Sequence, residues 1–276
     1  MPSLLSALGA RLRRKILNLA LGIVERHVAR QPGLYVFVYN RTDDTLVPIT
    51  WRARGVTLVA AGDERRRPTN DFAALEAVAP WAGKVVVDVG ANLGGTVARF
   101  AREAAKVYAL EPQPGNFAHL LDQIRIRRLD NVEPLQLAAA QKAGRATFYE
   151  RESHGIHSLG PHNKGRVRSS YEVDVTTLDQ LWRERINAPI GLLKIDVEGF
   201  EADVLEGAGW LLDNRLIESI VFEFSPKIHA IRGLPADAPL RVLKAHGYAI
   251  FTLDGAPVGA GTLPGLCDLI ARPAGQ

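Results

Sequence analysis

The sequence predicts an α/β fold with a seven-stranded, mostly parallel sheet of the Rossmann-like type and helices on both faces. From residue 84 onward, apolar runs of strand length alternate with segments of helical pattern, an order typical of parallel βαβ units. The clearest apolar run, 85–89, begins with three consecutive valines and has no polar alternation. Such a run indicates a strand that is covered on both faces, as in a parallel sheet between helices.

Length and composition agree with a globular protein. The chain has 276 residues, which suits one large domain or one domain with an appendage, and 47% of them are hydrophobic. The formal net charge of +4 indicates either a solvated basic surface or attraction to an anionic substrate or membrane. The single cysteine, Cys267, excludes an intrachain disulfide and is interpreted as a core thiol. This fits a reducing compartment, and we expect a cytoplasmic protein.

Residues 1–80 are expected to form an amphipathic helix and a small α/β cap, before a main domain over 81–276. Leucine and isoleucine recur at helical spacing from Leu5 to Ile23, and the pattern ends before Pro32. The apolar patch is too short to span a bilayer. Two interpretations of the helix stay open, namely packing on the main domain and docking on a membrane surface or a partner, including a second copy of the chain. Short strands are expected at 34–39, 46–51 and 56–60.

The main domain is expected to alternate strands and helices, with one insert. The helices are predicted at 95–104, 115–128, 200–212 and 236–246. The insert, 145–184, carries two expected strands, 145–150 and 171–175, around a polar loop of the kind that forms a lid or a substrate loop. The strands of the sheet are predicted at 85–89, 107–111, 132–137, 191–196, 217–224, 248–253 and 266–271.

The first strand of this domain ends in a glycine-bearing turn with an acid at its mouth. Asp88 is expected to point into that mouth, and Gly90 and Gly94 let the backbone turn sharply. Glu111 follows the next strand and is placed to accept hydrogen bonds from ribose hydroxyls. The turn has G-x-x-x-G spacing instead of the dinucleotide fingerprint, and a carboxylate attracts a sulfonium but repels a pyrophosphate. The turn therefore favours S-adenosylmethionine over a dinucleotide.

A second group of acids follows two later strands. Asp196 and Glu198 end the strand 191–196, and they are interpreted as site residues, the alternative for Asp196 being a helix cap. Glu223 could be a base, an acceptor of substrate hydroxyls, a divalent-metal ligand together with Asp196, or a carboxylate satisfied by backbone donors. A metal is not predicted. Glu201 and Glu206 fall inside the following helix and are interpreted as solvated.

The insert loop carries three histidines, and nothing near them completes a zinc site. His157, beside Ser158, is the candidate among them for a base that titrates near neutral pH. The alternative is an ordinary exposed loop histidine.

Several motifs, taken in order, resemble the FkbM family of S-adenosylmethionine-dependent methyltransferases. The resemblance spans about residues 84–224 and implies a class I methyltransferase sheet whose last strand runs antiparallel. It also implies methyl transfer, usually to an oxygen, on natural products or sugars. The combination of the first and last motifs is specific to that group. The motifs are Asp88–Thr96, Glu111–Phe117, Leu137–Ala140, Val175–Asp179 and Leu193–Glu201.

The resemblance also implies roles for individual residues. Glu111 would hold the ribose, and Ala139 or Ala140 would line the adenine. Asp196 and Glu198 would face the methyl acceptor. The methionine end of the cofactor pocket would be shaped by Asp88, Gly90, Asn92 and Thr96, together with their neighbour Ala91.

These observations predict an S-adenosylmethionine-dependent O-methyltransferase. An alcohol acceptor is a poor nucleophile, so a base is expected, in the order Glu198, Asp196, His157. The acceptor is expected to be a small molecule or a glycan, and no nucleic-acid partner is expected. The alternatives are a nicotinamide-dependent oxidoreductase on a similar sheet and a non-catalytic binding protein.

Overall fold

The computed structural model describes residues 36–40, 45–49, 75, 79–151, 158–160, 167–259 and 264–275. The chain divides into two compact units, 1–66 and 67–276, whereas the boundary predicted from the sequence lies at residue 80. In the first unit, β1 (Val36–Asn40) and β2 (Thr45–Ile49) pair antiparallel, which confirms two of the three strands expected there. The expected amphipathic helix and the strand 56–60 lie outside the described residues.

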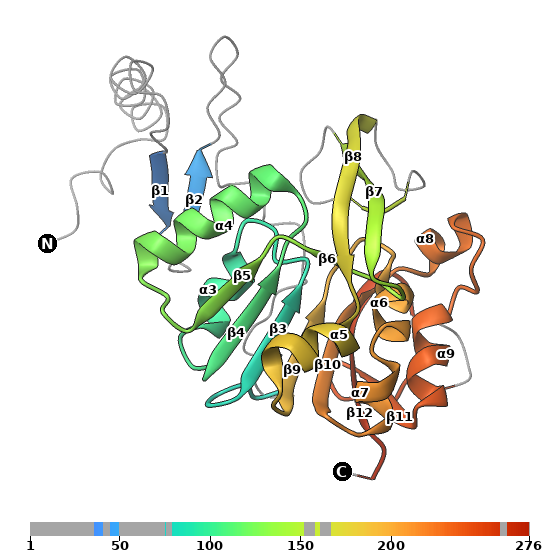
Figure 1. Cartoon of the computed structure of the whole chain (residues 1–276). Coiled ribbons are helices and arrows are strands. Elements are labelled where there is room, and N and C mark those ends of the chain that lie inside the picture. The colour runs from blue at the N-terminus through green and yellow to red at the C-terminus, as the bar shows by residue number, and fades with distance from the viewer. Residues whose placement is uncertain are drawn as a thin grey trace, which may run out of the picture. The chain divides into compact units, whose positions relative to one another are not determined.

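The described part of the second unit contains the seven-stranded sheet that the sequence predicts (Figure 1). Its order is β11-β12-β10-β9-β3-β4-β5, and β12 runs antiparallel to both of its neighbours while β10, β9, β3, β4 and β5 are parallel. The strands are β3 (Val85–Val89), β4 (Lys106–Leu110), β5 (Val132–Leu135), β9 (Ile190–Ile195), β10 (Ile217–Phe224), β11 (Tyr248–Thr252) and β12 (Cys267–Pro273).

Helices connect these strands. The expected helix 200–212 is two short helices, separated at Gly207 and Ala208. Two segments that the sequence analysis leaves without structure are helical, α5 (Leu178–Leu181), which continues as a π-helix to Ile186, and α8 (Pro226–Ile231). The other helices are α3 (Gly95–Phe100), α4 (Pro114–Arg127), α6 (Glu201–Glu206), α7 (Gly209–Asp213) and α9 (Ala238–Ala245).

The sheet has a hydrophobic core on each face, which explains why its central strands are apolar at most consecutive positions. Val86 contributes to the core that includes α3 and α4, whereas Val87 contributes to the core that includes α5, α6, α7 and α9. Both valines are fully buried. Successive side chains of a strand point to opposite faces, so a strand buried on both sides needs apolar residues at consecutive positions.

The insert and the short strand before it form a second, three-stranded sheet. β7 (Gly144–Arg151) and β8 (Val167–Thr176) pair antiparallel, which confirms the two strands expected there, and β6 (Ala138–Ala139) pairs parallel with β8. The three histidines of the intervening loop, His157 among them, lie outside the described residues.

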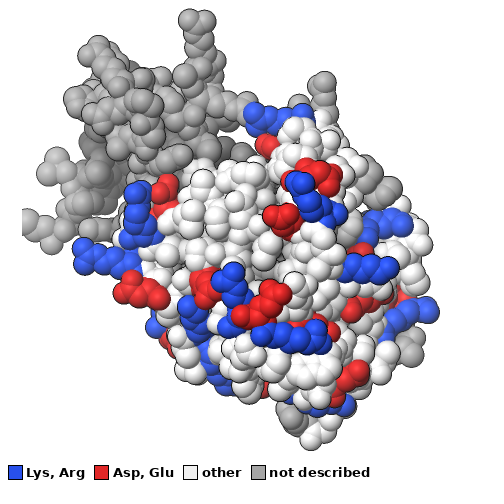
Figure 2. Space-filling view, in the orientation of Figure 1, with Lys and Arg blue, Asp and Glu red and all other residues white. Residues whose placement is uncertain are grey.

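The surface of the described residues carries charges of both signs. On the face shown in Figure 2, Lys and Arg side chains are interspersed with Asp and Glu, so this face has no continuous basic area. None of the helices in the described ranges has the length and hydropathy needed to cross a bilayer.

Candidate active site

A cavity of about 760 Å³, counting its part open to solvent, lies at the carboxyl ends of the central strands. Open α/β sheets bind their ligands at this edge. The turn after β3, the segment after β4 and the segment after β9 form much of its wall, and the insert sheet supplies another part. The lining residues are Val89, Gly90, Asn92, Glu111, Pro112, Asn116, Leu137, Ala138, Ala139, Phe148, Ser158, Leu159, Asp196, Val197, Glu198 and Phe200.

Gly90 lets two strand ends approach each other closely. Its φ of 87° is in the left-handed region, and a Cβ atom there would overlap the backbone carbonyl oxygen of Asp196. The amide of Asp196 donates to the carbonyl of Val89 at 2.9 Å, and the amide of Gly90 donates to the carbonyl of Leu110 at 3.0 Å. The turn after β3 is thus bound to the ends of β4 and β9, which brings the predicted acids to one edge.

Glu111 is a buried acid, 5% exposed, in the wall of the cavity. Its Oε2 accepts from the amide of Asn92 at 2.8 Å and its Oε1 from the amide of Gln113 at 2.9 Å. Burial raises the pKa of Glu111 to about 7, because desolvation outweighs the stabilisation of the charged form by these amides. The carboxyl group is therefore fixed in place and titrates near neutral pH.

The side chain of Asp88 does not point into the cavity, as the sequence predicts it would. Its side chain is fully buried and does not line the cavity. It accepts from the Thr96 hydroxyl at 2.6 Å and from the Lys194 ammonium at 3.3 Å. The expectation that Asp88 points into the mouth and attracts a sulfonium is corrected, since Lys194 balances its charge inside the protein.

Lys194 also binds Asp196, whose Oδ2 lies 3.4 Å from the ammonium nitrogen. Burial lowers the pKa of Lys194, but the carboxylates of Asp88 and Asp196 outweigh this effect, so the pKa lies above its ordinary value. The ammonium thus stays charged and holds Asp196 at the rim of the site.

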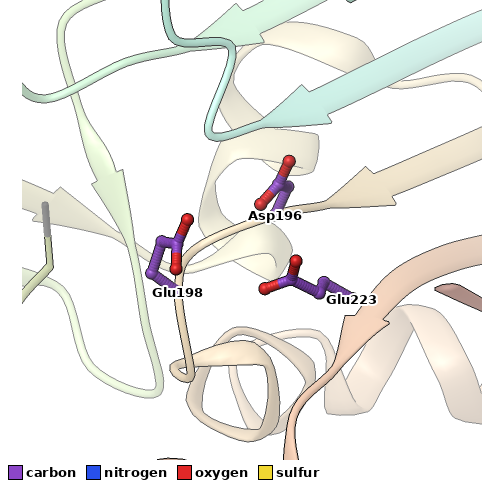
Figure 3. A group of neighbouring side chains, drawn as sticks. All are labelled: Asp196, Glu198 and Glu223. Atoms are coloured by element: carbon purple, nitrogen blue, oxygen red, sulfur yellow. The ribbon is translucent and has the colours of Figure 1, made fainter. Parts of the chain in front are cut away.

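Three predicted carboxylates converge beside the cavity (Figure 3). One oxygen each of Asp196, Glu198 and Glu223 lies within 4.8 Å of the others. Asp196 and Glu198 follow β9, and Glu223 is the second-last residue of β10. Clustered carboxylates can accept hydrogen bonds from several hydroxyl groups or ligate a divalent cation.

The structure brings together many of the predicted site residues, but not all. Six of them line the cavity, namely Gly90, Asn92, Glu111, Ala139, Asp196 and Glu198. Glu223 lies beside its acidic end. Ala91 is buried, Thr96 binds Asp88, and the Ala140 amide donates to Thr176, so these three support the wall without lining the cavity.

Two features of the site and its surroundings were not predicted from the sequence. The first is the apolar wall from the insert and from the start of α6, where Phe148 and Phe200 line the cavity. The second is Glu201, which is fully buried and not solvated, because His229 of α8 contacts it. Ser225 followed by Pro226 is a helix-start signal that could have revealed α8.

Strand order and site geometry together define a class of protein. The sheet reverses only at β12 among its described strands, an acid follows β4, and further acids follow β9. This is the Rossmann-like, class I methyltransferase architecture that the sequence predicts.

Comparison with known proteins identifies the family. The family model described as Methyltransferase FkbM domain matches residues 88–250, more than half of the chain, and the chain belongs to this family of methyltransferases. The 31-O-demethyl-FK506 methyltransferase FkbM of Streptomyces tacrolimicus is 31% identical over 214 residues, which cover 65% of this chain and 78% of that protein.

Two further similarities cover less of the other protein. The hexuronic acid methyltransferase AglP of Haloferax volcanii is 32% identical over 123 residues, covering 45% of this chain and 49% of that protein. A crystal structure of Methyltransferase FkbM from Methylobacillus flagellatus has a TM-score of 0.46 and 16% identity, covering 69% of this chain and 43% of the other.

Proposed function

We propose that the protein transfers a methyl group from S-adenosylmethionine to a hydroxyl oxygen of a sugar or natural product. The observation that carries the proposal is the arrangement of acids along one cavity. Glu111 occupies the end formed by β3 and β4, and the carboxylates of Asp196, Glu198 and Glu223 gather at the end formed by β9 and β10. The first end suits a nucleoside, and the second suits an acceptor rich in hydroxyl groups.

The cofactor end fits a nucleoside in shape and chemistry. When bound, S-adenosylmethionine supplies an electrophilic methyl group on a sulfonium and a thioether leaving group. Both oxygens of Glu111 are oriented by backbone amides, and Asn116 also hydrogen-bonds to the carboxyl group, which fixes it in a position to accept from ribose hydroxyls. Ala138 and Ala139 offer a small, apolar surface for the adenine.

The acceptor end supplies proton acceptors for an in-line displacement. The acceptor oxygen forms a bond to the methyl carbon as the carbon–sulfur bond breaks, and the hydroxyl proton passes to a carboxylate. Glu198 is the first candidate for this carboxylate, and Asp196, which Lys194 contacts, is the second. His157 remains a third candidate and lies outside the described residues.

The names of the relatives support an oxygen acceptor. One acts on 31-O-demethyl-FK506 and the other on hexuronic acid. Among the described residues that line this cavity there are carboxylates but no Lys or Arg, which favours neutral hydroxyl-bearing acceptors over anionic ones. The first acceptors to test are therefore neutral glycosides and polyhydroxylated natural products, with uronic acids for comparison.

The proposal is tested by incubating the full chain with S-adenosylmethionine and these acceptors, and detecting the gain of one methyl group by mass spectrometry. We expect Glu198→Gln and Asp196→Asn to lower kcat at least ~100-fold, the size of effect typical of a lost general base. Calorimetry should show that both variants still bind S-adenosylmethionine. Normal turnover in both variants would move the acceptor site elsewhere.

A matched control is available on β10. Glu218 pairs with Lys84 at the far end of the same strand that carries Glu223. Glu218→Gln removes a similar charge outside the cavity and should leave kcat unchanged. Failure of the wild-type chain to bind S-adenosylmethionine, together with tight binding of NAD, would overturn the proposal.

A further inference from the structure

We propose that Arg232 and the buried Glu201–His229 pair are positioning residues, which hold the turn after β9 so that Glu198 faces the methyl acceptor. The inference rests on the proposed function for its catalytic consequence. Its structural part, that Arg232 and Glu201 hold one turn and that His229 holds Glu201, stands on the contacts alone.

The turn that carries Glu198 has an unfavourable backbone conformation. Glu198 has a φ of 54° and Gly199 a φ of 97°, so two consecutive residues are in the left-handed region. Glycine adopts this conformation readily, whereas a glutamate rarely does, because its Cβ crowds the backbone. Such a residue keeps this conformation only where its surroundings impose it, and such residues cluster at functional sites.

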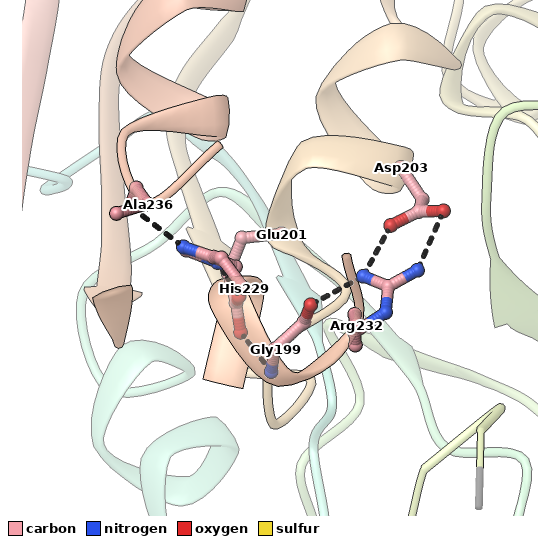
Figure 4. Close-up of polar contacts among 6 residues, drawn as sticks. All are labelled: Gly199, Glu201, Asp203, His229, Arg232 and Ala236. Carbon is pink, nitrogen blue, oxygen red and sulfur yellow. Dashed lines mark hydrogen bonds and ion pairs between the residues drawn. The ribbon is translucent and has the colours of Figure 1, made fainter. Parts of the chain in front are cut away.

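Arg232 binds the backbone carbonyl group of Gly199 in this turn (Figure 4). Its Nη1 donates to the carbonyl oxygen of Gly199 at 2.5 Å, and its guanidinium forms a two-pronged ion pair with Asp203 at 2.7 and 3.1 Å. The guanidinium carbon also lies 3.5 Å from the centre of the Phe200 ring, which lines the cavity. Only a planar, forked cation can make all of these contacts at once.

Glu201 binds the backbone amide of the same residue, Gly199. Its Oε1 accepts from the amide of Gly199 at 2.9 Å, so both backbone polar groups of Gly199 are held by side chains. Its Oε2 lies 3.3 Å from Nε2 of His229, and both side chains are fully buried. These two hydrogen bonds fix the backbone of Gly199, the residue next to Glu198. They therefore restrict the direction of the Glu198 side chain.

The buried pair must share a proton. Nδ1 of His229 lies 3.1 Å from the carbonyl oxygen of Ala236, and a carbonyl only accepts, so Nδ1 carries a hydrogen. The contact between Nε2 and Oε2 of Glu201 then holds one further proton. A glutamine at position 201 could reproduce both hydrogen bonds, accepting from Gly199 and donating to Nε2, whereas an alanine could reproduce neither.

Two sets of variants test the inference, each with its own comparison. Arg232→Met keeps the aliphatic stem but loses the fork, and Arg232→Lys keeps the charge. Arg241, a solvent-exposed side chain of α9 that pairs with Asp237 at 2.7 Å, gives the matched control Arg241→Met. Glu201→Ala is compared with the conservative Glu201→Gln. Each protein is measured for kcat, for the KM of S-adenosylmethionine, and for hydrogen exchange of the Gly199 amide by NMR.

We expect Arg232→Met and Glu201→Ala to exchange the Gly199 amide at least ~10-fold faster, since each removes a side chain that holds the turn. We also expect kcat to fall about 10- to 100-fold with little change in KM, the effect of a misplaced catalytic group. Arg232→Lys should share much of this loss, while Glu201→Gln should recover most of the kcat that Glu201→Ala loses. Arg241→Met should match the wild type.

Unchanged exchange and kcat in Arg232→Met and Glu201→Ala would overturn the inference, as would a loss confined to KM. If Glu201→Ala does not fold, the Arg232 variants still allow the test, because the Arg232 side chain, unlike that of Glu201, is partly exposed (11%). Failure of the proposed function is distinguishable, because the wild type would then transfer no methyl group while the exchange measurements still report on the turn.

Discussion

The ammonium nitrogen of Lys194 lies 3.3 Å from Oδ1 of Asp88, a carboxylate with no exposed surface. The two residues are opposite each other in the parallel pairing of β3 with β9. A second contact, to Asp196, connects this buried pair to the rim of the cavity. The charge at the end of β3 is therefore neutralised within the sheet, and the carboxylates that face the cavity belong to other strands.

Removing the cation of this pair should destabilise the protein. We expect Lys194→Met to lower the free energy of unfolding by about 3–5 kcal/mol, because it leaves the Asp88 carboxylate buried without its counter-charge. Denaturant titration measures the change. The double variant Lys194→Met/Asp88→Asn should recover much of the loss, since no buried charge remains.

A solvated ion pair gives the control for this experiment. Lys84 and Glu218 form a salt bridge with side chains that are 35% and 47% exposed. Lys84→Met should cost less than about 1 kcal/mol, as is usual for exposed pairs. Equal costs for the two lysine variants would contradict the role given to the Asp88–Lys194 pair.

Glu111 should make cofactor binding depend on pH. Its pKa of about 7 means that the free protein holds a proton on this carboxyl at pH 6, whereas hydrogen bonds from ribose hydroxyls favour the ionised form. We therefore expect the affinity for S-adenosylmethionine to rise from pH 6 to 8. Calorimetry in buffers of different ionisation enthalpy should detect the release of up to about one proton on binding at pH 6.

The same raised pKa has a consequence for stability. The native state holds a proton on Glu111 that the unfolded state, with its pKa near 4.5, has already released. The contribution of Glu111 to the free energy of unfolding is thus present below pH 4.5 and is lost as the pH rises to about 7. In Glu111→Gln this loss and the proton release should both disappear. For the binding experiment, an affinity of the wild type for S-adenosylmethionine that does not change between pH 6 and 8 would contradict the assignment of Glu111 to the ribose.

The sheet and its acidic edge were predictable for a simple reason. Central strands such as 85–89 and 190–195 are apolar at most consecutive positions, and the carboxyl ends of parallel strands meet at one edge, so acids at or after these ends converge. Partners across strands were not predictable in the same way. That Asp88 lies opposite Lys194 depends on the register of β3 and β9, which no local pattern encodes.

The burial of Glu201 shows the same limit on a helix. It stands at the first position of α6, where an acid is usually solvated and favourable for the helix dipole. The partner that allows its burial, His229, follows 28 residues later on another helix. The wall contributed by Phe148 depends likewise on how the insert sheet folds back over the strand ends, which composition does not specify.

Gly90 should tolerate no side chain, for two separable reasons. At a φ of 87° any other residue is strained, and a Cβ would also overlap the Asp196 carbonyl oxygen, which belongs to backbone and cannot move aside easily. Gly83 offers the matched comparison, since its φ is 70° and a Cβ there meets nothing within 4 Å. Gly83→Ala should cost about 1–2 kcal/mol of strain alone. Gly90→Ala should cost clearly more in denaturant titration and should weaken S-adenosylmethionine binding, because separating β3 from β9 distorts the cavity wall. Equal costs at the two positions would mean that the close approach of the strand ends is not needed.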